Sequence, residues 1–407
     1  MNNYFYNYCK HYEGLPSHIW IIIGIQLINS TSISIIYFLS LYFVNALYFD
    51  VTTAGLLISA FGFGTVFGGL IGGNLADYIS AKKIVIVSLI LQSISFLFLS
   101  TLNAIAPLTL ILFLLGISTY SFITANFIWA LSYTHNEEQR LKTINILDAV
   151  ANIGLGISAI ICSLLPIQHL KFISFVAAII LLLVVGYLIF TKRFSLTNAV
   201  SYSELSLTRD NKLTSHGILS ITLVLASLFL VGFIITQFCS TYSIYLHTLF
   251  PSSNFEMFGL VFALNTFLIV ILQTPIANYG RRFNRVMLMS TGAFLLSLGM
   301  TLLVLSTSFY WIILTSLVYT LGEILFFSVA QLICYENAPA NKKGFILGIY
   351  RIVYAMSRMV GPFVGAYVYQ QFGSNALWQL CGILGGSCFM ITIYFEYSRN
   401  LVQMEHR

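Results

Sequence analysis

The sequence predicts an all-α integral membrane protein, with twelve transmembrane helices arranged as two six-helix pseudo-symmetric halves. Three observations predict this fold class. The 407-residue chain is 58% hydrophobic and 8% charged, and its mean hydropathy is +0.89, whereas soluble domains carry about 25% charged residues. Its apolar residues gather in long stretches. Its basic residues gather in alternate connections between those stretches.

Twelve stretches, taken in chain order, are apolar over the length of about 20 residues that a helix needs to cross a bilayer. In the first half they cover 18–43, 51–75, 84–102, 106–131, 143–165 and 170–191. In the second half they cover 217–246, 255–277, 286–305, 309–334, 344–369 and 376–396. The polar stretch between the two sets predicts an N-terminal half over 1–191, a cytoplasmic linker over 192–216 and a C-terminal half over 217–407.

The basic residues predict the orientation. Sixteen of the nineteen Lys and Arg residues fall in connections on one predicted side, Lys171 falls on the other, and Arg351 and Arg358 lie inside a span. Because basic loops stay in the cytoplasm, both termini are expected there, and the protein is expected in the inner (cytoplasmic) membrane. The sixteen are Lys10, Lys82, Lys83, Arg140, Lys142, Lys192, Arg193, Arg209, Lys212, Arg281, Arg282, Arg285, Lys342, Lys343, Arg399 and Arg407.

The same features argue against several other classes of protein. The net charge of +6 is spread over short loops, which fits contact with lipid headgroups rather than with nucleic acid. The stretch after Pro16 is too long for the core of a signal peptide, so it is expected to remain as the first span. We find no Walker loop and no enzyme motif, and the six cysteines have no paired spacing. We therefore expect no enzyme activity, no cofactor and no metal.

The two halves repeat a short segment. Gly73-Asn-Leu-Ala-Asp-Tyr-Ile-Ser-Ala-Lys-Lys follows the second span, and Pro275-Ile-Ala-Asn-Tyr-Gly-Arg-Arg follows the eighth. Repeated halves with a site between them are a recurring transporter design.

On these residues the whole chain resembles the major facilitator superfamily. The strongest match is the segment from Gly73 to Lys83, although Tyr78, Ser80 and Ala81 replace the Arg, Gly and Arg that the family usually has. Further matches at 322–323 and 361–365 are most similar to the bacterial drug:proton antiporter branch. The resemblance implies a monomer that binds protons and a small-molecule substrate between two rocking halves. It also implies gating roles for Gly73, Asp77, Lys82, Lys83, Gly361, Pro362 and Gly365.

Two departures leave the direction of transport open. The fourth span carries no charged residue, whereas many proton-driven members of that branch have an arginine there. The fifth span has Asn152-Ile-Gly-Leu-Gly in place of the Gly-Pro signature that often accompanies antiport.

Charged residues inside spans are costly, at about 2.5–3.5 kcal/mol each at the bilayer centre, and so are functional candidates. Glu323 lies near the middle of the tenth span, and Arg351 and Arg358 lie on one face of the eleventh. Asp148 belongs to a polar stripe of the fifth span with Asn145 and Asn152. We predict Glu323 as the protonated group and the other three as its charge partners. Glu323 paired to an arginine in a static ion pair is the competing interpretation.

Polar and aromatic faces of other spans predict a roomy, amphiphilic cavity. Interhelical hydrogen bonds that involve no substrate are common for such side chains, so packing is the alternative for each one. The predicted substrate-binding residues are Gln26, Asn29, Tyr37, Tyr120, Asn126, Gln237, Thr241, Asn265 and Tyr319.

The sequence therefore favours a secondary transporter that exports amphiphilic molecules in exchange for protons. Uptake of an anionic metabolite or siderophore is an alternative, because two buried arginines suit an anion. A transport-inactive sensor or scaffold on the same fold is an alternative from another class, and lipid flipping also remains open.

Overall fold

The structure is a computed structural model that describes residues 15–76, 78–191, 215–253, 255–280, 283–306, 308–339 and 343–405. Eleven helices within these residues are long and apolar enough to cross a membrane, and none of these residues forms a strand. Helix α14 (Lys343–Phe372) falls outside that set although it is thirty residues long, because Arg351 and Arg358 lower its hydropathy. With α14 included, every predicted span corresponds to a helix, which confirms the predicted fold class.

Each half supplies six spans. The N-terminal half comprises α2 (Ser17–Ile33), α3 (Ile36–Asn45), α4 (Val51–Ala76), α5 (Ala81–Thr101), α6 (Ile105–Leu131), α7 (Glu137–Ser163) and α8 (Leu170–Phe190). The C-terminal half comprises α9 (Ser215–Thr236), η3 (Gln237–Cys239), α10 (Thr241–Leu249), α11 (Glu256–Gly280), α12 (Arg285–Thr301), α13 (Phe309–Asn337), α14 and α15 (Ser374–Glu405). The short 3-10 helices η1 (Ile167–His169) and η4 (Leu302–Leu305) flank α8 and α12.

Two predicted spans are broken rather than continuous, which corrects the sequence prediction. The first span divides into α2 and α3 at a turn over Ser34 and Ile35. The seventh divides into α9 and α10 at η3, followed by Ser240 with non-helical dihedral angles (φ −124°, ψ −77°). These spans occupy equivalent places in the two halves. Hydropathy averaged over a whole span does not detect either break, although polar residues such as Ser32, Gln237 and Ser240 lie beside them.

Helix packing repeats between the halves. In the N-terminal half α4 and α5 pack on α6, α5 packs on α8, and α2 packs on α7. The corresponding pairs α11–α13, α12–α13, α12–α15 and α9–α14 pack in the C-terminal half. Close approach is possible where glycines meet backbone, as at Gly64 against Gly116 and at Gly292 against Gly322.

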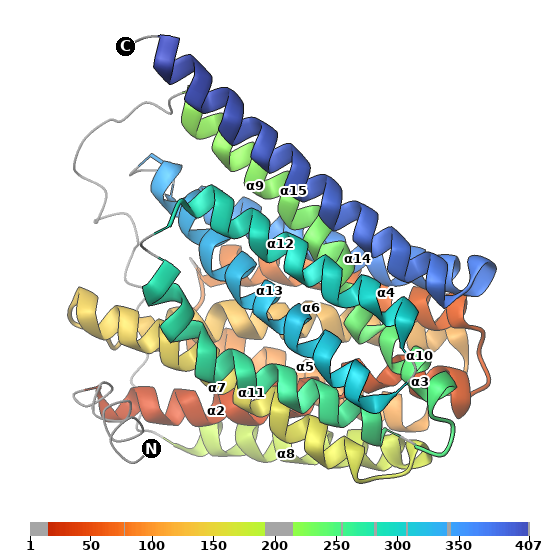
Figure 1. The fold of residues 1–407 in the computed structure, drawn as a ribbon. Helices are drawn as coiled ribbons and strands as arrows, with labels where there is room; N and C mark the ends of the chain where they lie inside the picture. Colours follow the sequence, from red (N-terminus) through yellow and green to blue (C-terminus); the bar gives the residue numbers. More distant parts are fainter. Residues whose placement is uncertain are drawn as a thin grey trace, which may run out of the picture.

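The two ends of the bundle differ in how tightly the halves meet. Helix α2 begins and α15 ends at one end, called here the terminal end, at the left of Figure 1. At the other end, called the far end, α4 packs on α14, α7 on α11 and α3 on α10. The Thr52 amide donates to the Gln370 side-chain oxygen (2.8 Å), and the Phe363 amide donates to the Ser59 hydroxyl (2.9 Å).

The terminal end is open by comparison. A Cβ atom added at Gly73 of α4 or Gly348 of α14 would meet no atom of the described residues within 4 Å. Asn145, Asp148 and Arg351 are exposed although they lie within predicted spans. The structure is therefore closed between the halves at the far end and open at the terminal end.

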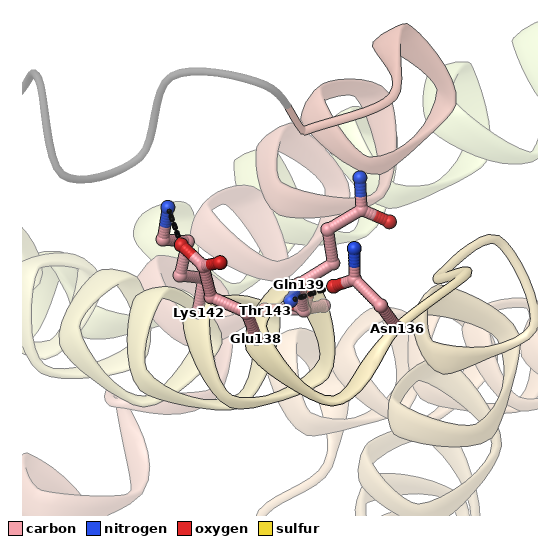
Figure 2. A network of polar contacts seen from close by, with 5 residues as sticks. All are labelled: Asn136, Glu138, Gln139, Lys142 and Thr143. Carbon is pink, nitrogen blue, oxygen red and sulfur yellow. Dashed lines mark hydrogen bonds and ion pairs between the residues drawn. The ribbon is translucent and has the colours of Figure 1, made fainter.

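Helix α7 begins six residues before the predicted fifth span, because polar residues cap it. The Asn136 side chain accepts from the Gln139 amide (2.8 Å), and the Gln139 side chain accepts from the His135 amide (3.0 Å). One turn on, Glu138 forms a 2.7 Å ion pair with Lys142, and the Thr143 hydroxyl donates to the Gln139 carbonyl (2.8 Å). Figure 2 shows this start of the helix. Reciprocal bonds of this kind satisfy amides that the first turn leaves unpaired.

Asp50 caps α4 at the far end and makes its start sensitive to acid. Its carboxylate accepts from the Thr53 amide (2.8 Å) and the Thr53 hydroxyl (2.6 Å). The Thr53 hydroxyl is the main cause that lowers the pKa of Asp50 below its ordinary 3.8. Because the pKa is lower in the folded state, this stabilisation is complete above about pH 4 and is lost as pH falls through the folded-state pKa.

We therefore expect Asp50→Ala to lower the free energy of unfolding by about 1 kcal/mol at pH 7, as for other helix caps. The difference from wild type should shrink as pH falls below 4. Thermal unfolding of both proteins in detergent across that pH range checks this. A difference that is constant with pH would contradict a charge-dependent cap.

Candidate functional site

A cavity lies between the two halves at the level of the two helix breaks. It comprises about 490 Å³ of space, counting the part that opens to solvent. Its wall combines polar groups with aromatic rings, which is the composition expected of a site for an amphiphilic ligand. The polar lining residues are Asn152, Thr236, Asn265, Thr266, Glu323 and Arg358. The aromatic lining residues are Tyr37, Phe238, Phe262, Tyr319 and Tyr354.

Glu323 is held in this wall by an amide. It lies on α13, and its carboxylate accepts from the Asn265 side-chain amide on α11 (2.9 Å). The same amide donates to the Thr320 hydroxyl (3.0 Å), which in turn donates to the Ser316 carbonyl (2.7 Å). These bonds fix the carboxyl group at the cavity surface.

The ion pair considered for Glu323 does not form. Within the described residues, no salt bridge joins Glu323 to an arginine; the salt bridges found there are Glu138–Lys142 and Arg285–Glu336. Arg358 lies on a different helix, α14, and interacts with other residues. The expectation of a Glu323–Arg contact was therefore wrong for this conformation, because sequence distance between spans ten and eleven does not fix the direction of either side chain.

Arg358 is surrounded by aromatic rings. Its guanidinium donates to the Tyr120 hydroxyl of α6 in the opposite half (3.0 Å). It also lies over the rings of Phe61 (5.5 Å), Tyr120 (5.7 Å) and Tyr354 (6.0 Å), which is the distance range of cation–π attraction. The α14 backbone at Arg358 lies close to Gly62 of α4. The contact is so close that a Cβ atom built at Gly62 would collide with the Arg358 carbonyl.

Asp148 and Arg351 lie nearer the terminal end. Both are exposed. They belong to opposite halves, and no salt bridge joins them among the described residues. The Arg351 guanidinium lies 6.0 Å from the centre of the Phe127 ring. In the polar stripe of α7, the Asn152 amide donates to the Asp148 carbonyl (3.1 Å) and lines the cavity.

The predicted substrate-binding residues fall into two groups. Tyr37, Asn265 and Tyr319 line the cavity, and Tyr120 reaches it through Arg358. The other five form hydrogen bonds between or within helices. They are Gln26 with Asn126 (2.8 Å), Asn29 with Gln92 (2.5 Å), and Gln237 with Thr241 (3.1 Å) and with the Gly361 carbonyl (3.0 Å).

Sequence reasoning missed most of the aromatic wall. Phe238, Phe262 and Tyr354 were not singled out, although Phe238 stacks on Tyr319 with ring centroids 5.4 Å apart and Phe262 packs on Tyr37 at 4.5 Å. One signal was available for Tyr354, which precedes Arg358 by four residues and so shares its helix face. Phenylalanines are so common in this chain that nothing marked the other two.

The predicted gating residues are spread over both ends. Asp77 lies outside the described residues, and a Cβ atom at Gly73 would meet none of the described atoms within 4 Å at the terminal end. Lys82 and Lys83 lie in the first turn of α5. Gly361 and Gly365 let α14 approach the broken seventh span, since a Cβ atom at either would collide with Thr236 or Gln237. Pro362 packs against Gly55 of α4 at the far end.

Comparisons with known proteins agree with this architecture. The family model for the Major Facilitator Superfamily matches residues 22–253 and 228–402. The MFS-type transporter YqjV of Bacillus subtilis (strain 168) is 24% identical to the chain over 379 residues, which are 92% of each protein.

Solved transporter structures share the fold at low sequence identity. A POT family transporter crystallised with 5-aminolevulinic acid has a TM-score of 0.78 at 16% identity, covering 95% of this chain and 96% of that one. The nucleoside transporter NupG has a TM-score of 0.74 at 14% identity, covering 94% of this chain and 99% of that one.

Proposed function

The chain belongs to the Major Facilitator Superfamily, and from this premise we propose that it is a proton-coupled secondary active transporter of amphiphilic small molecules. Membrane transport is the activity of the family. The finer proposal is that substrate binds in the central cavity, that Glu323 takes up and releases the proton, and that the halves rock to expose the cavity at either end. The protein is proposed to act as a monomer in the inner membrane, with both termini cytoplasmic.

The observation that carries this proposal is the position of Glu323. It is the one acidic side chain in the described lining of the cavity, and an amide and a hydroxyl hold it there instead of a cation. A carboxyl group without a fixed counter-charge can bind a proton without first breaking an ion pair. Its location in the substrate cavity allows the proton and the substrate to affect each other directly.

Export in exchange for protons is the direction that the sequence favours, through its similarity to the drug:proton antiporter branch. Uptake of an anion is a second candidate, and a specific observation favours it. Arg358 presents a positive charge to the cavity, and no acidic side chain of the described residues forms a salt bridge with it.

The test is transport in proteoliposomes under an imposed proton gradient, with a pH indicator in the lumen and pooled amphiphiles and organic anions as substrates. We expect a substrate to drive proton movement in wild type and not in Glu323→Gln. Glu256→Gln is the matched control, because Glu256 is an exposed carboxylate in the first turn of α11, away from the cavity. Substrate movement without protons, unchanged in Glu323→Gln, would refute proton coupling at Glu323.

A further inference from the structure

The charges inside the bundle divide into two sets. Asp148 and Arg351 are exposed towards the terminal end, where water and salt screen their opposite charges. Glu323 and Arg358 line the central cavity, and within the described residues neither forms a salt bridge. The net charge of the cavity therefore depends on the proton at Glu323 and on whatever the cavity holds.

Arg358 is built to receive an anion. A guanidinium has five N–H donors and no acceptor. Among the described residues, the Arg358 guanidinium makes one hydrogen bond, to the Tyr120 hydroxyl. The rings of Phe61, Tyr120 and Tyr354 stabilise the charge but supply no counter-ion. A planar, forked group of this kind suits a carboxylate, sulfonate or phosphate. The surrounding rings suit an aromatic or aliphatic body attached to it.

The other titratable groups that face Glu323 and Arg358 do not change this charge balance near neutral pH. They are Tyr37 of α3, Tyr120 of α6, Cys239 of η3, Tyr319 of α13 and Tyr354 of α14. Phenol and thiol side chains are neutral at that pH under ordinary conditions. Asn152, Asn265 and the threonines in the wall carry no charge.

Two loadings then leave the cavity neutral. In one the cavity is empty and Glu323 is ionised, so that its charge balances Arg358. In the other a monovalent anion balances Arg358 and Glu323 carries a proton. The empty cavity with protonated Glu323 has a net positive charge, and the anion with ionised Glu323 has a net negative charge. Carrying either net charge across the bilayer is opposed by the cost of desolvating it.

We propose that the substrate is an amphiphilic organic anion that binds at Arg358 together with a proton at Glu323, so that both cross the membrane in the same direction, one for one. This rests on the proposed function and selects its second candidate, because an inward proton gradient would then drive uptake. An amphiphilic cation is disfavoured, since it would meet the charge of Arg358.

The test uses full-length protein in proteoliposomes with naphthalene sulfonate as the probe. This compound is ionised at every pH used, so it cannot cross the lipid as a neutral acid. Its trimethylammonium analogue, which has the same ring system and a positive charge, is the charge control. Two readouts are needed: accumulation of the probe under an inward proton gradient, and exchange of labelled for unlabelled probe without a gradient.

Wild type should accumulate the anion, acidify the lumen as it does so, and ignore the cation. Glu323→Gln should lose accumulation at least tenfold but keep exchange, because its loaded cavity is neutral while its empty cavity keeps the charge of Arg358. Arg358→Gln should lose both activities. Arg358→Lys should retain the preference for the anion. Lys171→Gln, which removes a positive charge at the far end, where Lys171 bonds to Asn103, should match wild type.

Several results would overturn the proposal. They are preference for the cation, movement of anion and proton in opposite directions, loss of exchange together with accumulation in Glu323→Gln, and failure of wild type to bind or transport naphthalene sulfonate. Proton movement driven by a neutral or cationic compound would overturn this coupling mode but leave the proposed function intact. Absence of proton coupling for every compound would instead remove the proposed function.

Discussion

Gly62→Ala is expected to open the far end of the bundle and to reduce transport. A Cβ atom at Gly62 of α4 would collide with the main-chain carbonyl of Arg358 and lie 2.8 Å from the Met359 amide nitrogen. Both obstacles belong to the backbone of α14, so no side-chain rotation relieves them. Overpacking of this kind costs about 1–3 kcal/mol, which would reduce the population of the closed far end about 5- to 150-fold. The proposed rocking of the halves needs both conformations, so turnover should fall as one becomes rare.

The measurement is the reaction of a membrane-impermeant thiol reagent with Ser59→Cys, in a background whose native cysteines are replaced. Ser59 is 7% exposed, and its hydroxyl accepts from the Phe363 amide of α14. Adding Gly62→Ala should speed the labelling of this position. Gly69→Ala is the matched control on the same helix, because a Cβ atom there would lie 4.0 Å from its nearest neighbour, a Tyr120 ring atom. Equal labelling rates for the two alanine variants would contradict this interpretation of the α4–α14 contact.

The second large effect concerns stability. Gly365→Ala is expected to lower the free energy of unfolding by about 2–4 kcal/mol, combining overpacking with the loss of buried hydrogen bonds. A Cβ atom at Gly365 would displace the Gln237 side chain. Gln237 is fully buried, and its amide donates to the carbonyls of Phe233 and Gly361, both at 3.0 Å. Moving it would leave these polar groups unpaired at the break in the seventh span.

Thermal unfolding in detergent measures this effect. Gly386→Ala on α15 is the control, because a Cβ atom there would meet nothing within 4 Å, and alanine within a helix is favoured over glycine by about 0.5–1 kcal/mol. Combining Gly365→Ala with Gln237→Ala should cost less than the sum of the single changes, since the two residues share one space. Strict additivity would show that the collision with Gln237 is not the cause.

Most of the fold could be predicted from sequence because lipid acts on each segment separately. A run of about 20 apolar residues prefers the bilayer whatever its neighbours are, so the spans were found even in α14, where Arg351 and Arg358 interrupt the run. The breaks at Ser34 and at Gln237–Cys239 were missed for the same reason. They change backbone geometry, while the hydropathy averaged over the span stays high despite the polar residues beside each break.

The candidate site was predicted in part. Because an intramembrane charge is costly, the sequence analysis selected Glu323 and Arg358 as functional candidates. Both line the cavity. Their partners were not predictable, because Asn265 and Tyr120 are neutral residues that look like many others in this chain. Asn29 and Gln237 are amide side chains within apolar spans, as Asn265 is. Asn265 lines the cavity, whereas Asn29 bonds to Gln92 and Gln237 bonds to the Gly361 carbonyl. Residue type does not say whether a polar group faces a neighbouring helix or the space between the halves.

The sequence by itself therefore determined that this chain is a twelve-span membrane protein of two related halves, and which charged residues lie within its spans. Tertiary structure alone decided that Glu323 is held by Asn265 and that Arg358 meets Tyr120, a residue 238 positions away in the other half. It also decided that the halves close at the far end. The physical reason is that partition into lipid depends on local composition, whereas hydrogen bonds and helix crossings depend on atoms that only folding brings together.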